Sequence, residues 1–113
     1  MQEVYKKDGT VVNLLDSTFY KEVYLGITNS LVKGTAYKLK IDNLSFVFID
    51  ITALTQIPKW SQIVYGLNNI NQEFDLMDVN NTYRFQYHKN GFIQNAVDIP
   101  ENTRIVINFY IKE

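Results

Sequence analysis

LSFVFIDITAL, at residues 44–54, is the most apolar run of the chain and is dense in β-branched and aromatic side chains. Such a composition is typical of a β-strand. The two-residue period of a strand sorts these side chains onto two faces, with Leu44, Phe46 and Phe48 on one and Val47, Ile49 and Ile51 on the other. Because both faces are apolar, the run predicts a buried central strand that the rest of the chain covers.

The size and composition of the chain indicate one globular domain. Its 113 residues are enough for a single modest core. They are 46% hydrophobic and include 8 Tyr and 7 Phe, a composition that argues against disorder and favours strands. We therefore expect residues 1–113 to form one β-sandwich domain, in which residues 1–30 include a hairpin or serve as an attachment segment.

Charge and residue content exclude several classes of partner. A net charge of −1 provides no basic surface for phosphates, so neither nucleic acid nor a membrane surface is an expected partner. The chain has no Cys and hence no disulfide or thiolate site. No apolar run approaches the roughly 20 residues of a spanning helix, and no secretion signal is recognised at the N-terminus. Without a glycine-rich phosphate loop, no cofactor is expected.

Alternating apolar residues, interrupted by turn residues, predict a series of short strands around the central one. Extended segments are expected at residues 4–5, 10–15, 19–25, 36–41, 62–67, 73–77, 82–94 and 103–112. The segment 82–94 is the clearest hairpin, because Asn90-Gly91 suits the positive φ angles of a tight turn. This pattern predicts an all-β fold, an antiparallel β-sandwich of jelly-roll type.

Three segments have features beyond simple alternation. Residues 19–25 also fit a helix capped near Ser17, although extended structure is favoured. In residues 36–41, Lys38 and Lys40 alternate with apolar residues, which predicts a strand that turns its lysines toward water. Pro58 ends any strand that continues past residue 55, so residues 56–61 are expected to form a loop.

The sequence contains few residues that could act in catalysis. The single histidine, His88, lies beside the predicted hairpin turn and is interpreted as an exposed turn residue. Glycoside hydrolysis needs only two carboxylates, and Asp50 with Glu73 or Asp75 is the one pairing to consider. Asp50 is more simply explained as a satisfied polar residue of a strand. We therefore expect a protein that is not an enzyme.

Oxygen-rich side chains gather between residues 75 and 81, at Asp75, Asp78, Asn80 and Asn81. Carboxylate and amide oxygens are the ligands that calcium prefers. The spacing differs from that of an EF-hand loop and lacks its glycine and its closing glutamate. No metal site is expected here.

Four aromatic residues are candidates for ligand binding, Trp60, Tyr65, Tyr83 and Tyr87. Exposed aromatic faces stack against the apolar side of sugar rings. Trp60 follows Pro58 in the predicted loop and is the candidate most expected to be exposed. Packing is nevertheless the favoured interpretation for all four, and more so for the tyrosines in strands.

The order of five segments in the chain is distinctive when they are taken together. They are the strand at 44–53, Trp60, the IVYGL sequence at 63–67, the NGFIQ sequence at 90–94 and the amphipathic strand at 103–112. This order resembles the C-terminal domains of phage tail fibres and baseplate receptor-binding proteins, which are small β-sandwiches found as homotrimers. The resemblance covers roughly the last 80 residues of the chain.

The resemblance implies a structural protein of the virion, located in a tail or capsid appendage. Such a protein would pack against other virion proteins or bind a saccharide of the host surface, without catalysis. A homotrimer would also cover sheet edges and surplus apolar faces. Three alternatives remain: a monomeric carbohydrate-binding module of a bacterial protein, a small capsid fibre or decoration protein, and a small β-sandwich enzyme.

Overall fold

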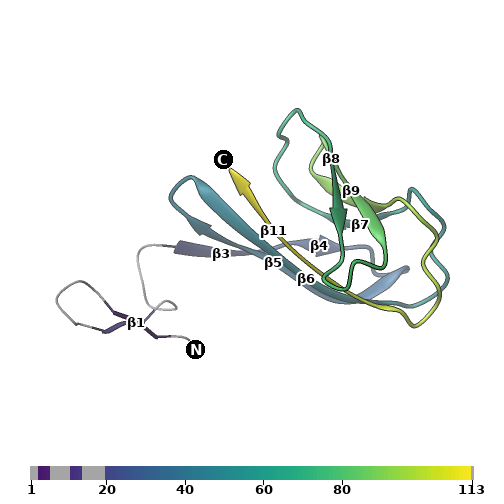
Figure 1. The fold of residues 1–113 in the computed structure, drawn as a ribbon, viewed down its shortest axis with the longest axis horizontal. Helices are drawn as coiled ribbons and strands as arrows, with labels where there is room; N and C mark the ends of the chain where they lie inside the picture. Colours follow the sequence, from purple (N-terminus) through teal and green to yellow (C-terminus); the bar gives the residue numbers. More distant parts are fainter. Residues whose placement is uncertain (1–2, 6–10, 14–19, 113) are drawn as a thin grey trace.

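The computed structural model describes residues 3–5, 11–13 and 20–112, and every regular element in these residues is a β-strand. A four-stranded and a five-stranded antiparallel sheet lie against each other, as Figure 1 shows. The prediction of an all-β antiparallel sandwich is confirmed. A third, two-stranded sheet consists of β1 (Glu3–Tyr5) and β2 (Val11–Asn13), which confirms two predicted strands near the N-terminus. The predicted turn between them lies outside the described residues.

The four-stranded sheet has the order β11-β6-β5-β3. Its strands are β3 (Tyr20–Tyr24), β5 (Val32–Ile41), β6 (Leu44–Ala53) and β11 (Arg104–Lys112). β6 pairs with β5 over ten residues and with β11 over nine, so the predicted central strand does lie at the centre of this sheet. β3 is extended, and the helix considered for this segment does not form over residues 20–24.

The five-stranded sheet has the order β4-β7-β10-β9-β8. Its strands are β4 (Gly26–Ile27), β7 (Gln62–Tyr65), β8 (Phe74–Met77), β9 (Arg84–His88) and β10 (Phe92–Asn95). β9 and β10 form the predicted hairpin, in which Gly91 adopts a φ angle of +90°. The loop expected before β7 is also present, with one bridge between Ile57 and Ile99.

The core lies between the two sheets and takes alternate residues from most strands, whereas β7 contributes two consecutive ones. From the four-stranded sheet come Val47, Ile49, Ile51, Ile105, Ile107 and Ile111. From the five-stranded sheet come Ile63, Val64, Phe85, Tyr87 and Ile93. Burial of such side chains removes apolar surface from water and is the main stabilising contribution.

The other face of β6 differs from the prediction. Phe46 and Phe48 are only partly buried and Leu44 is exposed, so β6 is buried on one face and not on both. The prediction for the lysines of β5 is also wrong, because Lys38 is buried and donates a hydrogen bond from Nζ to Asn68 Oδ1 at 2.8 Å. The register explains both differences: the pairs Lys38–Val47 and Tyr37–Phe48 place the lysine on the inner face and the rings on the outer one.

Two glycines with the same φ angle of +90° allow the cost of a close backbone contact to be measured. A Cβ on Gly91 would overlap the carbonyl oxygen of Leu67, whereas a Cβ on Gly66 would lie 3.7 Å from its nearest neighbour. Gly66→Ala is expected to lower the free energy of unfolding by about 1 kcal/mol and Gly91→Ala by about 3 kcal/mol or more. Chemical denaturation of the two variants measures this difference, and equal losses would contradict the contact.

Candidate functional site

The loop at residues 57–61, which we call the Trp60 loop, holds its tryptophan in an unusual backbone conformation. The φ angle of Trp60 is +68°, a left-handed value that large side chains rarely adopt. The side chain is nevertheless 52% exposed, so burial in the core does not account for the conformation. Strained residues of this kind are concentrated at binding and catalytic sites.

Asn95, at the end of β10, fixes the Trp60 loop. Its side chain is fully buried, and Oδ1 accepts the N–H of Ser61 at 3.1 Å. Its Nδ2 contacts three carbonyl oxygens, those of Ile57 at 3.3 Å, Pro58 at 2.9 Å and Val97 at 2.8 Å. The Asn95 carbonyl also accepts the N–H of Trp60 at 2.6 Å. One buried amide therefore satisfies several backbone groups of the loop.

Two further bonds hold the loop from outside the core. Asp98 Oδ1 accepts the N–H of Lys59 at 2.9 Å, and the Ser61 hydroxyl donates to the Pro58 carbonyl at 2.7 Å. The indole of Trp60 thus projects from a loop that is bonded at nearly every residue. The backbone that carries the indole is therefore held in place, and a backbone ordered in advance reduces the entropy that binding would cost.

The other three aromatic candidates lie in different environments. Tyr65 ends β7, is 45% exposed and places its ring against Gly26 on the neighbouring strand. Tyr83 is partly buried and packs against the core. Tyr87 has no exposed surface, and its hydroxyl donates to the Asn68 carbonyl at 2.7 Å, so its ring is not available to a ligand. The structure therefore does not gather the four residues into one site.

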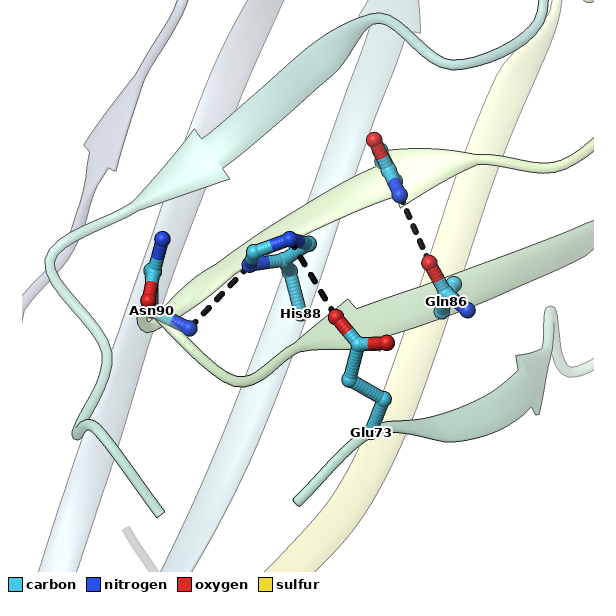
Figure 2. Close-up of polar contacts among 5 residues, drawn as sticks. Glu73, Gln86, His88 and Asn90 are labelled. Atoms are coloured by element: carbon cyan, nitrogen blue, oxygen red, sulfur yellow. Dashed lines mark hydrogen bonds and ion pairs between the residues drawn. The ribbon is translucent and has the colours of Figure 1, made fainter. Parts of the chain in front are cut away.

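His88 lies on the outer face of the five-stranded sheet and is bonded at both ring nitrogens. Nε2 is 3.2 Å from the Glu73 carboxylate, and Nδ1 accepts the N–H of Asn90 at 3.1 Å, as Figure 2 shows. The imidazole also stacks on Phe92, with ring centroids 4.3 Å apart. His88 is therefore partly buried and stabilises the β9–β10 turn, in contrast to the exposed turn residue that the sequence suggested.

The outer face of the five-stranded sheet continues beyond this histidine with polar side chains. Gln94 Nε2 donates to Gln86 Oε1 at 2.6 Å, from paired positions of β10 and β9. Figure 2 shows this bond beside the contact between His88 and Glu73. Two separate polar pairs, Gln94–Gln86 and His88–Glu73, thus lie on this face.

The carboxylates considered for glycoside hydrolysis do not come together. Asp50 lies on the outer face of the four-stranded sheet, where Arg104 binds both of its oxygens at 3.0 and 2.8 Å. This hydrogen bonding by Arg104 holds the pKa of the Asp50 carboxyl below its usual value. Asp75 and Glu73 belong to the opposite side of the sandwich, at β8 and just before it. Both sheets therefore separate Asp50 from its supposed partners.

The oxygen-rich cluster forms a turn. Asp78 is buried, and its Oδ1 accepts the N–H groups of Thr82 at 2.7 Å and Tyr83 at 2.9 Å. These bonds are those of an aspartate that stabilises a turn. Within residues 3–5, 11–13 and 20–112, no three His, Cys, Asp or Glu side chains are placed to share a metal ion.

The outer face of the four-stranded sheet carries a large apolar surface, which we call the aromatic face. It consists of Tyr24, Tyr37, Leu39, Ile41, Leu44, Phe46, Phe48, Val106 and Tyr110. Its rings contact one another across strands, with centroid distances of 5.4 Å for Tyr37–Phe48 and 5.0 Å for Phe46–Tyr110. Sequence reasoning assigned several of these residues to the core, because apolar alternation does not distinguish a covered face from an open one.

Asn95 was also missed by sequence reasoning. A single asparagine near a strand end is usually a turn residue, and no local pattern distinguishes a buried amide from an exposed one. Its partners Ile57 and Ser61 lie more than thirty residues away in the chain, with separations of 38 and 34. The neighbouring Pro58 was the one local sign that the loop is special.

Comparison of the chain with protein-family models, with curated proteins and with solved structures gives no match. In the part of the chain that the structure describes, no helix has the length and apolar character needed to cross a membrane. The function therefore has to be inferred from the surfaces themselves.

Replacing Asn95 tests whether this residue fixes the Trp60 loop. Asn95→Ala leaves buried carbonyl groups and one N–H without partners, so the free energy of unfolding is expected to fall by about 2–4 kcal/mol. The fluorescence of Trp60, the single Trp of the chain, is expected to move to longer wavelength as the loop opens. Gln94→Ala, on the adjacent outward position, serves as the control. If both variants gave the same emission spectrum, the role of Asn95 would be refuted.

The ion pair of Arg104 with Asp50 predicts a specific pH dependence. Since the pKa of Asp50 is lowered in the folded chain, the pair stabilises the fold fully above the ordinary aspartate pKa of about 3.9. This contribution is lost as the pH falls through the lower folded-state pKa. Arg104→Gln is expected to lower the free energy of unfolding slightly at pH 7, and this cost is expected to shrink as the pH falls below the ordinary aspartate pKa. Denaturant titrations across this range, with Lys112→Gln as the control, measure the difference; a constant cost would contradict it.

Proposed function

We propose that the chain is a receptor-binding domain of a phage tail fibre or baseplate, which attaches a virion to a saccharide on the host surface without catalysis. The order of segments from residue 44 onward supports the virion assignment by resemblance. The conformation of Trp60 supports the saccharide-binding part, and it is the observation on which this proposal depends.

The energetic balance at Trp60 favours a binding role. A left-handed backbone costs a non-glycine residue about 1–2 kcal/mol. The half-buried indole recovers a comparable amount through packing, on the order of 2–3 kcal/mol. Trp60 therefore adds little net stability, although a glycine would avoid the strain. A strained residue whose ring is exposed and adds little net stability is best explained by a contact between that ring and a ligand.

The exposed indole is chemically suited to sugars. Its flat apolar surface stacks on the C–H side of a pyranose, while Lys59 and Asp98 beside it offer polar groups to hydroxyls. A single ring of this kind gives weak binding. Several copies on one appendage would strengthen attachment through avidity, which is consistent with a homotrimer.

Two substitutions at Trp60 separate binding from stability. Trp60→Gly removes the ring and the strain together, so its free energy of unfolding is expected to stay within about 1 kcal/mol of the wild type. Trp60→Ala keeps part of the strain and is expected to be about 1 kcal/mol less stable than Trp60→Gly. Both variants are expected to lose binding to a panel of bacterial surface oligosaccharides, measured on a glycan array and by titration.

The controls are Tyr65→Ala and Trp60→Phe. Tyr65→Ala removes an exposed ring elsewhere, so binding through the Trp60 loop should persist, and Trp60→Phe should retain part of the affinity. A loss of about 3–5 kcal/mol in Trp60→Gly would show that Trp60 is a packing residue. Oligosaccharide binding that survives both Trp60→Gly and Trp60→Ala would also refute the proposal.

A carbohydrate-binding module is the second candidate function. It is favoured by one observation: bonds from Asn95 and Asp98 of the same chain are sufficient to hold the Trp60 loop, as a monomeric module requires. The molar mass in solution separates the two candidates. A stable trimer, at three times 13.2 kDa, supports the phage appendage, and a monomer that binds oligosaccharide supports the module.

A further inference from the structure

The aromatic face is a second surface, unrelated to the Trp60 loop. It lies on the side of the four-stranded sheet that faces away from the core, and the five-stranded sheet covers the other side. Tyr24 and Tyr110 are 75% and 66% exposed, and Ile41 and Leu44 are also exposed. Soluble proteins seldom leave such a contiguous apolar surface open unless another surface covers it.

The size of the face matches what an interface between proteins requires. Three strands of nine or ten residues and one of five, spaced about 4.8 Å apart and rising about 3.3 Å per residue, span about 540 Å² before side chains roughen the surface. A stable protein–protein interface covers roughly 800 Å² on each partner. The aromatic face would therefore form most of one interface.

Charged residues of opposite sign flank the aromatic face on its two edge strands. Glu22 lies exposed on β3, and Lys112 lies exposed on β11 at the other edge. A hydrogen bond from the Tyr24 hydroxyl to the Glu22 carboxylate raises the pKa of this tyrosine and places the carboxylate on the same face. Between the edges, Asp50 and Arg104 neutralise each other within the chain. A further charged residue of this face, Lys33, pairs with Thr52 at the end of the sheet where the aromatic residues stop.

Opposite charges on opposite edges make the face complementary to a copy of itself. Glu22 is level with Leu39, Phe46 and Tyr110 across the sheet, and Lys112 lies one row away, level with Leu44. When neighbouring copies are related by a symmetry axis that runs parallel to their strands, the β3 edge of one copy lies beside the β11 edge of the next. Glu22 then meets the region of Tyr110 and Lys112 in the neighbour.

We propose that copies of this chain associate through the aromatic face, with Glu22 on the β3 edge of one copy beside Lys112 on the β11 edge of the next. Tyr24 and Tyr110 are buried by this contact. The inference names the interface of the homotrimer proposed above and rests on that assembly, but it is independent of saccharide binding by Trp60.

Charge exchange tests the proposed contact. Glu22→Lys and Lys112→Glu are each expected to weaken association by about tenfold, because each places like charges together. The double variant Glu22→Lys/Lys112→Glu restores opposite charges and is expected to associate within about threefold of the wild type. Sedimentation equilibrium over a range of protein concentrations measures these changes, and circular dichroism verifies that each variant is folded.

A carboxylate placed within the face gives a second test. Tyr110→Glu is expected to yield a folded monomer, because association would bury a second carboxylate beside Glu22 of the neighbour. Met77→Glu makes a similar change on the outer face of the five-stranded sheet and is expected to leave association unchanged.

The outcomes distinguish the inference from the proposed function. The interface is supported if Tyr110→Glu dissociates the wild-type assembly and the double charge variant recovers the association that the single charge variants lose; a wild-type dimer refutes the count of three. A wild-type trimer that is insensitive to Tyr110→Glu overturns the interface and leaves the trimer standing. A wild-type monomer at all concentrations overturns both the interface and the trimer, whereas saccharide binding through Trp60 is judged by its own variants.

Discussion

The pairing of β6 with strands on both sides is the constraint on which the rest of the structure depends. Ten residues of β6 pair with β5 and nine with β11, so its register determines which side chains of all three strands face the core. A shift by one residue would turn Asp50 and Thr52 inward and Ile49 and Ile51 outward. Burial of an unpaired carboxylate is expensive, so Asp50 helps to specify the register that also forms its bond with Arg104.

The same register produces both the core and the aromatic face. Because β6 is apolar on both faces, one set of its side chains builds the core and the other set builds the aromatic face. The five-stranded sheet covers only the first set. The fold thus combines a closed core, an open apolar surface and, at the end of β10, a buried amide that holds the Trp60 loop.

The sequence was sufficient to predict the sandwich and most of its strands, because these depend on local patterns, but it missed β4 and the first four residues of β5. Alternation identified β5, β6 and β11, and Asn90-Gly91 identified the hairpin turn. Local patterns do not determine which face of a two-sided apolar strand is covered, since this depends on where the second sheet lies. For that reason Lys38, assigned to solvent, is buried, and Phe46, assigned to the core, is partly open.

The sequence predicted those parts of the candidate site in which the type of a residue alone indicates its environment. Pro58 predicted the loop, and a tryptophan after it predicted exposure, which holds for Trp60. The alternation of Tyr83, Phe85 and Tyr87 grouped residues of one face, but nothing in it distinguished the inner face from the outer one. The role of Asn95 depends on contacts between distant parts of the chain, which no local pattern encodes.

The position of β11 in the chain has a consequence for biosynthesis. β6 and its neighbour β5 form a local hairpin, but the other edge of β6 pairs with β11, which is synthesised much later. Until β11 is synthesised, the nascent chain presents a long apolar strand with one unpaired edge and an incomplete core. Such intermediates are prone to intermolecular strand pairing. Productive folding therefore requires the synthesis of β11, and the interval before it is when a chaperone would have the greatest effect on yield.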